Sequence, residues 1–125
     1  MRYVSTRDDS KENSFEDVLI KGLADDGGLY VPKSLKKYSI QELSGLKKLD
    51  YIELSTEIIN QFSSDFISKD KLLSLIKKSY SSFREEEVIK ISNLGKIKLL
   101  ELFHGPTLAF KDIAMQFIGN LYEYY

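Results

Sequence analysis

The residues from 101 to 112 read ELFHGPTLAFKD, and the interpretation of the whole sequence starts from them. They contain the sole histidine, His104, one of the two prolines, and Lys111 between apolar neighbours. An apolar, strand-like run precedes this stretch and a helical period follows it. A loop at the carboxyl end of a strand is a common ligand site in α/β sheets. We therefore expect the chemistry of this protein to lie in this loop.

The second half of the loop leads into a helix predicted over residues 111–125. Gly105 and Pro106 predict a sharp turn, and Thr107 is the predicted N-cap. Lys111 then lies in or near the first helical turn, where the helix dipole disfavours a cation by roughly 0.3–1 kcal/mol. A lysine in this unfavourable position suggests a role other than keeping the surface soluble.

Nucleophilic chemistry is one such reason. Apolar neighbours such as Phe110 and Ile113 are expected to desolvate the ammonium of Lys111, and desolvation favours the neutral amine that attacks an aldehyde. The alternative is a solvated surface lysine that packs along the helix or pairs with Asp112. Spacing alone leaves both interpretations open.

Composition removes most other chemistry. The 125 residues include 42% hydrophobic residues and 15 aromatic rings, which is typical of a folded chain, and the net charge of −1 does not favour binding to nucleic acid or anionic lipid. The absence of cysteine excludes disulfides, thiolate metal sites and cysteine nucleophiles, and a single histidine argues against a metal site. No leader peptide or membrane span is predicted, so we expect a cytoplasmic protein.

The first third of the chain predicts a strand, a helix and a second strand. Residues 3–6 are β-prone, Ser14 and Asp17 form a capping-box pattern, and residues 29–31 are expected to form a strand that Pro32 ends. The adjacent glycines of residues 25–28 (DDGG) predict a tight turn. A phosphate-binding role for this turn is disfavoured, because it leads into a strand rather than a helix.

Three further helices are predicted from their caps, over residues 39–48, 50–62 and 68–78. The second is expected to bury Ile52, Ser55, Ile59 and Phe62, and the third Leu72, Leu75, Ile76 and Tyr80. From residue 88 the pattern changes to two strands, 88–91 and 97–102, with a turn at 93–95. The last helix is apolar on two faces, one with Ile113, Phe117 and Leu121 and one with Met115, Ile118 and Tyr122, so we expect it to be buried between layers.

Two segments of the sequence resemble the threonine synthase family of fold-type II enzymes that depend on pyridoxal phosphate. The string HGPTLAFKD (104–112) is similar to the segment around the family's cofactor-binding lysine. The strings YVSTR (3–7), SFED (14–17) and GLADDGGLYVP (22–32) look like the family's N-terminal signature, except that Asp8 stands where a glycine is usual. The helices between residues 39 and 83 match only in character.

The resemblance implies an α+β fold: a mostly helical N-terminal domain over residues 1–85, then the opening strand, loop and helix of a fold-type II α/β domain over residues 86–125. It implies that Lys111 binds pyridoxal 5'-phosphate covalently and moves protons on the substrate. The implied substrate is O-phospho-L-homoserine, which reacts with water to give L-threonine and phosphate. Thr107 is a candidate substrate contact, His104 is expected to order the turn, and Asp112 is expected to support the first helical turn.

Family enzymes are several-fold longer, so we expect this chain to be an N-terminal fragment that is inactive by itself. Two alternatives remain. A threonine-synthase-like phospho-lyase would release a 2-oxo acid, and a non-catalytic interaction module would use the helical faces between Ile52 and Tyr80. The sequence gives no oligomeric state.

Overall fold

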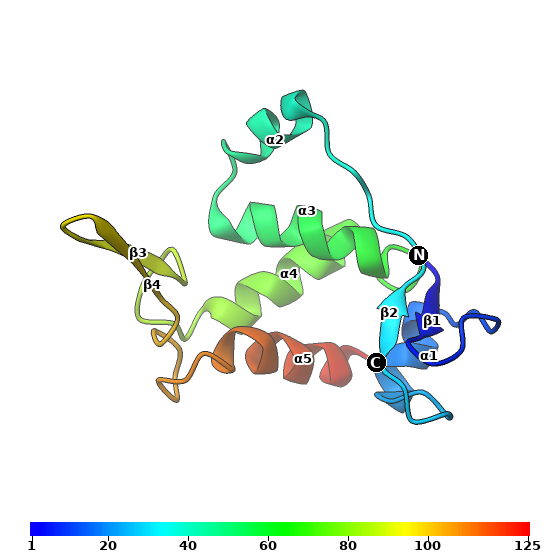
Figure 1. Ribbon diagram of the computed structural model, residues 1–125. Helices are drawn as coiled ribbons and strands as arrows, with labels where there is room; N and C mark the ends of the chain where they lie inside the picture. Colours follow the sequence, from blue (N-terminus) through cyan, green and yellow to red (C-terminus); the bar gives the residue numbers. More distant parts are fainter. The chain divides into compact units, whose positions relative to one another are not determined.

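The computed structural model describes residues 1–125 and contains five helices and two small sheets (Figure 1). In chain order the elements are β1 (Tyr3–Ser5), α1 (Phe15–Lys21), β2 (Tyr30–Pro32), α2 (Ile40–Leu46), α3 (Tyr51–Ser63), α4 (Lys69–Tyr80), β3 (Lys90–Leu94), β4 (Ile97–Glu101) and α5 (Asp112–Tyr124). The expected mixture of α and β structure is confirmed. No helix combines the length and the apolar character that crossing a bilayer requires.

The chain divides into two compact units, and helices α3 and α4 contribute residues to both. The first unit contains Met1–Lys48 and Thr56–Leu72, and the second contains Leu49–Ser55 and Leu73–Tyr125. Each unit is described separately below.

The first unit is organised around the antiparallel pair β1–β2, in which Tyr3 lies opposite Pro32 and Ser5 opposite Tyr30. The Tyr3 hydroxyl donates to the carbonyl of Phe62 at 2.7 Å. The Phe15 ring lies between the rings of Tyr3 and Phe66, with centroids 6.1 and 5.6 Å away. Burial, reinforced by the charge of Asp65, raises the pKa of Tyr3 to about 12. A cluster of three aromatic rings, in which Tyr3 is buried and Phe15 and Phe66 are half-buried, therefore joins the first strand to the helical part of this unit.

Local capping signals predicted the helix starts well. Ser14 with Asp17, and Ser39 with Glu42, form reciprocal capping boxes at α1 and α2. At α3 the Glu53 amide donates to Asp50 Oδ1 at 2.7 Å, and the Asp50 amide donates to Glu53 Oε2 at 3.2 Å. Such pairs lie within one turn, so a sequence window of four residues is sufficient to find them.

The expected apolar face of α4 is confirmed, because Leu72, Leu75, Ile76 and Tyr80 are all buried. The expected face of α3 is only half-buried, and two small polar residues of this helix are more buried than that face. Its fully buried side chains are Thr56 and Ser63, and the predicted Ile52, Ser55, Ile59 and Phe62 are half-buried. The Ser63 hydroxyl donates to the carbonyl of Ile59 at 3.1 Å, so its burial leaves no polar group unsatisfied.

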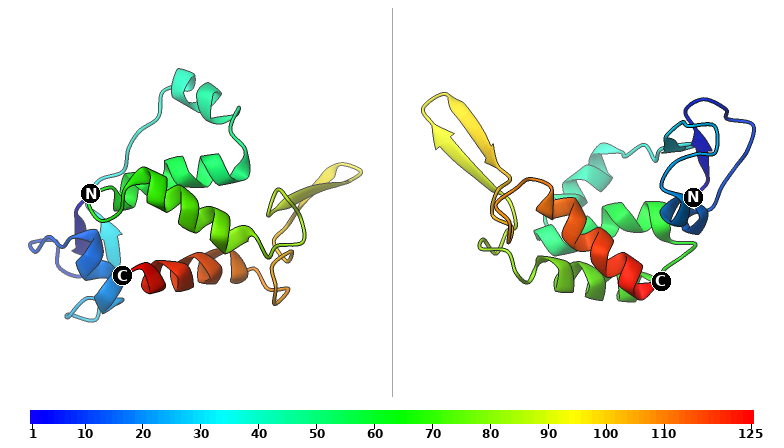
Figure 2. Two further views of the ribbon diagram at one scale, coloured as in Figure 1. Left: turned by 180° about the vertical axis from the view of Figure 1, so that it is seen from behind. Right: turned by 90° about the horizontal axis from the view of Figure 1, so that it is seen from below.

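In the second unit, α5 lies beside the last turns of α4 (Figures 1 and 2). The Tyr80 hydroxyl donates to the carbonyl of Ile113 at 3.0 Å, and the Asn120 amide donates to Ser79 Oγ at 3.0 Å. Phe117 and Leu121 are buried on this side. The second apolar face is not covered, since Met115 is 57% exposed. The expected burial of α5 on both faces is therefore wrong for this chain.

Strands β3 and β4 form an antiparallel hairpin in which Lys90 lies opposite Glu101 and Leu94 lies opposite Ile97. Figure 2 shows this hairpin extending away from α5. The predicted turn at 93–95 was wrong, because Asn93 and Leu94 belong to β3 and the turn contains Gly95 with a φ of 63°. A two-residue hairpin turn with positive φ matches the twist of the strands. Five large apolar side chains are exposed on this hairpin: Ile91, Leu94, Ile97, Leu99 and Leu100.

Candidate functional site

Residues 102–111 connect the end of β4 to the start of α5, as the sequence predicted. Lys111 occupies the N-cap position of α5 with helical dihedral angles of −62° and −23°. Its carbonyl accepts hydrogen bonds from the amides of Ala114 at 3.1 Å and Met115 at 2.8 Å. The backbone of Lys111 is therefore part of the first helical turn, and the expected position of this residue is confirmed.

The side chain of Lys111 faces solvent. Phe110 is 64% exposed, so it does not enclose the amine, and the expected desolvation by the flanking residues is not found in this chain. The ammonium forms no ion pair with Asp112 either, because the Asp112 carboxylate is bound by Thr107. The surroundings of Lys111 therefore match the alternative of a solvated surface lysine, but without the pairing to Asp112 that this alternative also allowed.

Thr107 is not the N-cap of the helix. The α-helix begins five residues later, after a tight turn in which the Asp112 amide donates to the carbonyl of Ala109 at 3.0 Å. Instead, the Thr107 amide donates to Asp112 Oδ2 and the Thr107 hydroxyl donates to Asp112 Oδ1, both at 2.8 Å. A single residue thus gives both of its donors to one carboxylate.

Asp112 is only 3% exposed and begins α5, where the helix dipole favours an anion. Burial alone would raise its pKa, but hydrogen bonds from the Thr107 hydroxyl and from the backbone of Thr107 and Ala109 stabilise the charged form. The balance holds the pKa of Asp112 below its ordinary value. The expected support of the first turn by Asp112 is confirmed.

Two backbone features make the loop compact. A Cβ atom on Gly105 would lie 2.3 Å from Asp112 Cβ and 2.5 Å from Asp112 Oδ2, so only glycine fits there. Leu108 has a φ of 61°, a left-handed conformation that costs a side-chain-bearing residue roughly 1–2 kcal/mol. Strain of this kind persists where the surrounding contacts fix the backbone, and it is common at functional sites.

His104 has a structural environment. Its Nε2 lies 2.8 Å from Glu101 Oε2, and its carbonyl accepts from the Arg84 amide at 2.9 Å. The hydroxyl of Ser92 and the ring of His104 lower the pKa of Glu101. These contacts join the end of β4 to the segment before β3, so the expected role of His104 in ordering the turn is supported, with its side chain contributing as well as its backbone.

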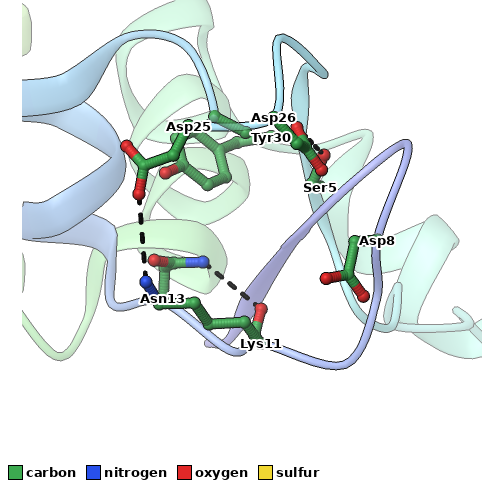
Figure 3. A pocket seen from close by; sticks show the side chains of 8 residues that line it. Ser5, Asp8, Lys11, Asn13, Asp25, Asp26 and Tyr30 are labelled. Carbon is green, nitrogen blue, oxygen red and sulfur yellow. Dashed lines mark hydrogen bonds and ion pairs between the residues drawn. The ribbon is translucent and has the colours of Figure 1, made fainter.

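The N-terminal signature forms a separate cluster in the first unit (Figure 3). Asp26 Oδ1 accepts from Ser5 Oγ and from the Gly28 amide, both at 2.8 Å. Gly27 has a φ of 77°, and its amide donates to the carbonyl of Ala24 at 2.9 Å, which confirms the predicted tight turn. A hollow of about 120 Å³ lies beside this turn and is lined by Ser5, Asp8, Lys11, Asn13, Ala24, Asp25, Asp26 and Tyr30. Figure 3 shows the side chains that line it.

The sequence did not reveal that the two halves of this signature bind each other. The Arg7 guanidinium donates to the carbonyl of Asp26 at 2.9 Å, and the Leu29 amide donates to Thr6 Oγ1 at 3.0 Å. These partners are about twenty residues apart, and no local spacing connects them. The only available signal was that both strings belong to one family signature.

Comparison with known proteins shows which family the chain resembles. The model described as "Threonine synthase N terminus" matches residues 2–80. The chain is 41% identical to a threonine synthase of Schizosaccharomyces pombe over 98% of its own length and 24% of the relative, and 41% identical to that of Pseudomonas aeruginosa over 99% and 27%. A crystal structure of threonine synthase from Brucella melitensis with bound pyridoxal phosphate superimposes with a TM-score of 0.94 at 35% identity, over 99% of this chain and 27% of that one.

These relatives are named threonine synthases, and one matched crystal structure is of a threonine synthase with bound pyridoxal phosphate. The chain belongs to the threonine synthase family. It spans about a quarter of the length of the curated relatives it matches.

Proposed function

We propose that these residues are the N-terminal part of a threonine synthase, which converts O-phospho-L-homoserine and water to L-threonine and phosphate. The observation that carries the proposal is the position of Lys111, an accessible amine on a loop fixed by a buried aspartate, within the string that resembles the family's cofactor-binding segment. The family match over residues 2–80 lies outside this loop and supports the same conclusion independently.

Pyridoxal phosphate fits the residues that this chain offers. Lys111 presents an ammonium that has no acidic partner, and its backbone is held by the first turn of α5. When bound, the cofactor supplies an electron sink for negative charge on the carbon atoms of an amino-acid substrate. Lys111 would hold the cofactor through Nζ, and the same atom would carry the proton at the substrate Cα.

We propose further that the 125 residues alone do not catalyse the reaction. Phe110 and Leu108 beside the lysine are 64% and 52% exposed, so nothing in this chain excludes water from the amine. Exclusion of water is needed for strong electrostatic stabilisation in an active site. We also keep the division near residue 85 between an N-terminal domain and the start of the catalytic domain as a proposal, supported by the end of the family match at residue 80.

The test is the reaction of the full-length protein that carries these residues with O-phospho-L-homoserine. Equal amounts of L-threonine and phosphate are expected, and Lys111→Ala is expected to abolish their formation. Lys98→Ala is the matched control, since Lys98 is an exposed lysine of β4, and it should retain full activity. Formation of a 2-oxo acid instead of threonine would favour the phospho-lyase alternative, and full activity of Lys111→Ala would contradict the proposal.

A further inference from the structure

The most unusual charged group in the second unit is the carboxylate of Asp112, which is 3% exposed although its chain neighbour Lys111 faces solvent. A buried carboxylate is tolerated only when hydrogen bonds replace its water. The main hydrogen-bond partner of the Asp112 carboxylate is Thr107, five residues earlier in the chain, which supplies two donors at 2.8 Å. Additional hydrogen bonds come from the Ala109 backbone and the Gln116 side chain.

These contacts close the loop into a ring. Residues 107–112 run from the donors of Thr107 to the carboxylate that accepts from them, and the backbone of Gly105 lies directly against the Asp112 side chain. Lys111 is the last residue inside the ring. Its φ and ψ are therefore fixed from one side by the carboxylate and from the other by the first turn of α5.

From this geometry we propose that Asp112 is a positioning residue for Lys111: it fixes the loop so that the lysine side chain leaves the backbone in one direction. The inference rests on the proposed function, in which Lys111 binds the cofactor. Asp112 acts through Thr107 and does not touch the amine. Thr107 is then a loop-closing residue first, although its hydroxyl oxygen keeps lone pairs for one further contact.

A purely structural cap is the competing explanation, and the chain contains a matched control for it. In α1, Asp17 Oδ2 accepts from the Ser14 amide at 2.9 Å and from the Ser14 hydroxyl at 2.6 Å. This is the same pair of donors on the same type of acceptor. Asp17 is exposed and belongs to the first unit, whereas Asp112 is buried and is the next residue after Lys111 in the chain.

The first measurement uses the 125-residue chain and does not depend on the enzyme assignment. Asp112→Ala is expected to increase the hydrogen-exchange rate of the Thr107 amide by about tenfold or more, because its acceptor is removed. Asp17→Ala should leave that amide unchanged. Unchanged protection of Thr107 in Asp112→Ala would overturn the ring itself.

The second measurement uses the full-length protein and has two readouts for each variant. One is the rate at which Lys111 binds pyridoxal phosphate, measured by trapping the product with borohydride, and the other is the melting temperature. Asp112→Ala is expected to slow capture and to lower kcat by about 10- to 100-fold with KM changed less than about threefold, since small misplacements of a reacting group have effects of this size. Asp112→Asn should recover most of the rate, because the Thr107 hydroxyl can turn to accept from the new amide. Asp17→Ala should lower the melting temperature without slowing capture.

Equal slowing by Asp17→Ala would show that general stability accounts for the effect, and an unchanged capture rate in Asp112→Ala would refute positioning. If Asp112→Ala does not fold, Thr107→Val decides the question, since it removes one donor and keeps the shape. If borohydride places the cofactor on another lysine in the unmodified protein, the proposed function fails, and the exchange result on Thr107 still stands by itself.

Discussion

Asp26 in the first unit and Asp112 in the second hold their surroundings by similar chemistry. Each accepts one hydroxyl and one backbone amide at 2.8 Å, and each lies next to a glycine that has no room for a Cβ atom. Asp26 is exposed and joins segments 21 residues apart, whereas Asp112 is buried and closes a loop within five residues. The first arrangement holds strands together, and the second fixes the backbone around Lys111.

The largest effect on stability is expected from adding a methyl group to Gly105, which lies against the buried Asp112 side chain. Gly105→Ala would place a Cβ atom 2.3 Å from Asp112 Cβ, which belongs to a rigid part of the side chain, so the loop must move. We expect the free energy of unfolding of the 125-residue chain to fall by about 3 kcal/mol in urea titrations. Gly45→Ala is the control, because it meets open space in a helix and should raise stability by about 0.5–1 kcal/mol. Equal stability of the two variants would contradict the close packing of the loop.

Removing the exposed aspartate is expected to have a smaller effect. Asp26→Ala leaves the Ser5 hydroxyl and the Gly28 amide without their acceptor, and both residues are buried. An unsatisfied buried donor costs about 1–3 kcal/mol, and water can reach this exposed turn, so we expect a loss of about 2 kcal/mol in the free energy of unfolding. Lys111 reactivity should not change. A change in the rate of cofactor capture by the full-length Asp26→Ala protein would show that the two clusters are not independent.

The pH dependence of stability tests whether the charged form of the buried Asp112 carboxylate stabilises the fold. Because the pKa of Asp112 is lower in the folded chain than its ordinary value of 3.8, the folded state is stabilised above that value, and this contribution is lost as the pH falls through the folded pKa. The stability advantage of the unmodified chain over Asp112→Asn should therefore be largest at neutral pH and shrink on acidification. Urea titrations across the acid range check this, and a constant difference would contradict it.

The smallest predicted effect concerns the strained residue of the loop. Leu108→Gly removes the left-handed strain, worth roughly 1–2 kcal/mol, and adds the entropy of glycine, about 0.5–1 kcal/mol. We expect a net gain of about 0.5–1 kcal/mol in the free energy of unfolding, and Leu108→Ala, which keeps a Cβ atom, should show no such gain. A lower stability of Leu108→Gly would contradict this expectation and would mean that the Leu108 side chain contributes more to the free energy of unfolding than its exposure suggests.

The sequence predicted most of the fold because its signals are local. The capping pairs Ser14–Asp17 and Ser39–Glu42 lie within one turn, and the buried stripe of α4 repeats at helical spacing. The exact start of β3 was harder to predict, because Val88 adopts a φ of 64° that β-branched residues rarely take and the strand begins only at Lys90.

The candidate site was predictable in position but not in detail. The string around Lys111 located the loop, but Thr107 resembles a helix cap in sequence, and only the tight turn at residues 109–112 shows why its donors reach Asp112 instead. The contact of Ser5 with Asp26 depends on the pairing of β1 with β2, which no short sequence window contains. Long-range pairing and side-chain partners are set by packing rather than by local preference.

The most direct test of the account is to find the lysine that carries the cofactor. The full-length protein is loaded with pyridoxal phosphate, reduced with borohydride and digested, and the modified peptide is identified by mass spectrometry. We predict that, of the fifteen lysines in these 125 residues, Lys111 alone carries the reduced cofactor at one equivalent per chain. Stoichiometric modification of any other lysine, with Lys111 unmodified, would contradict the central claim.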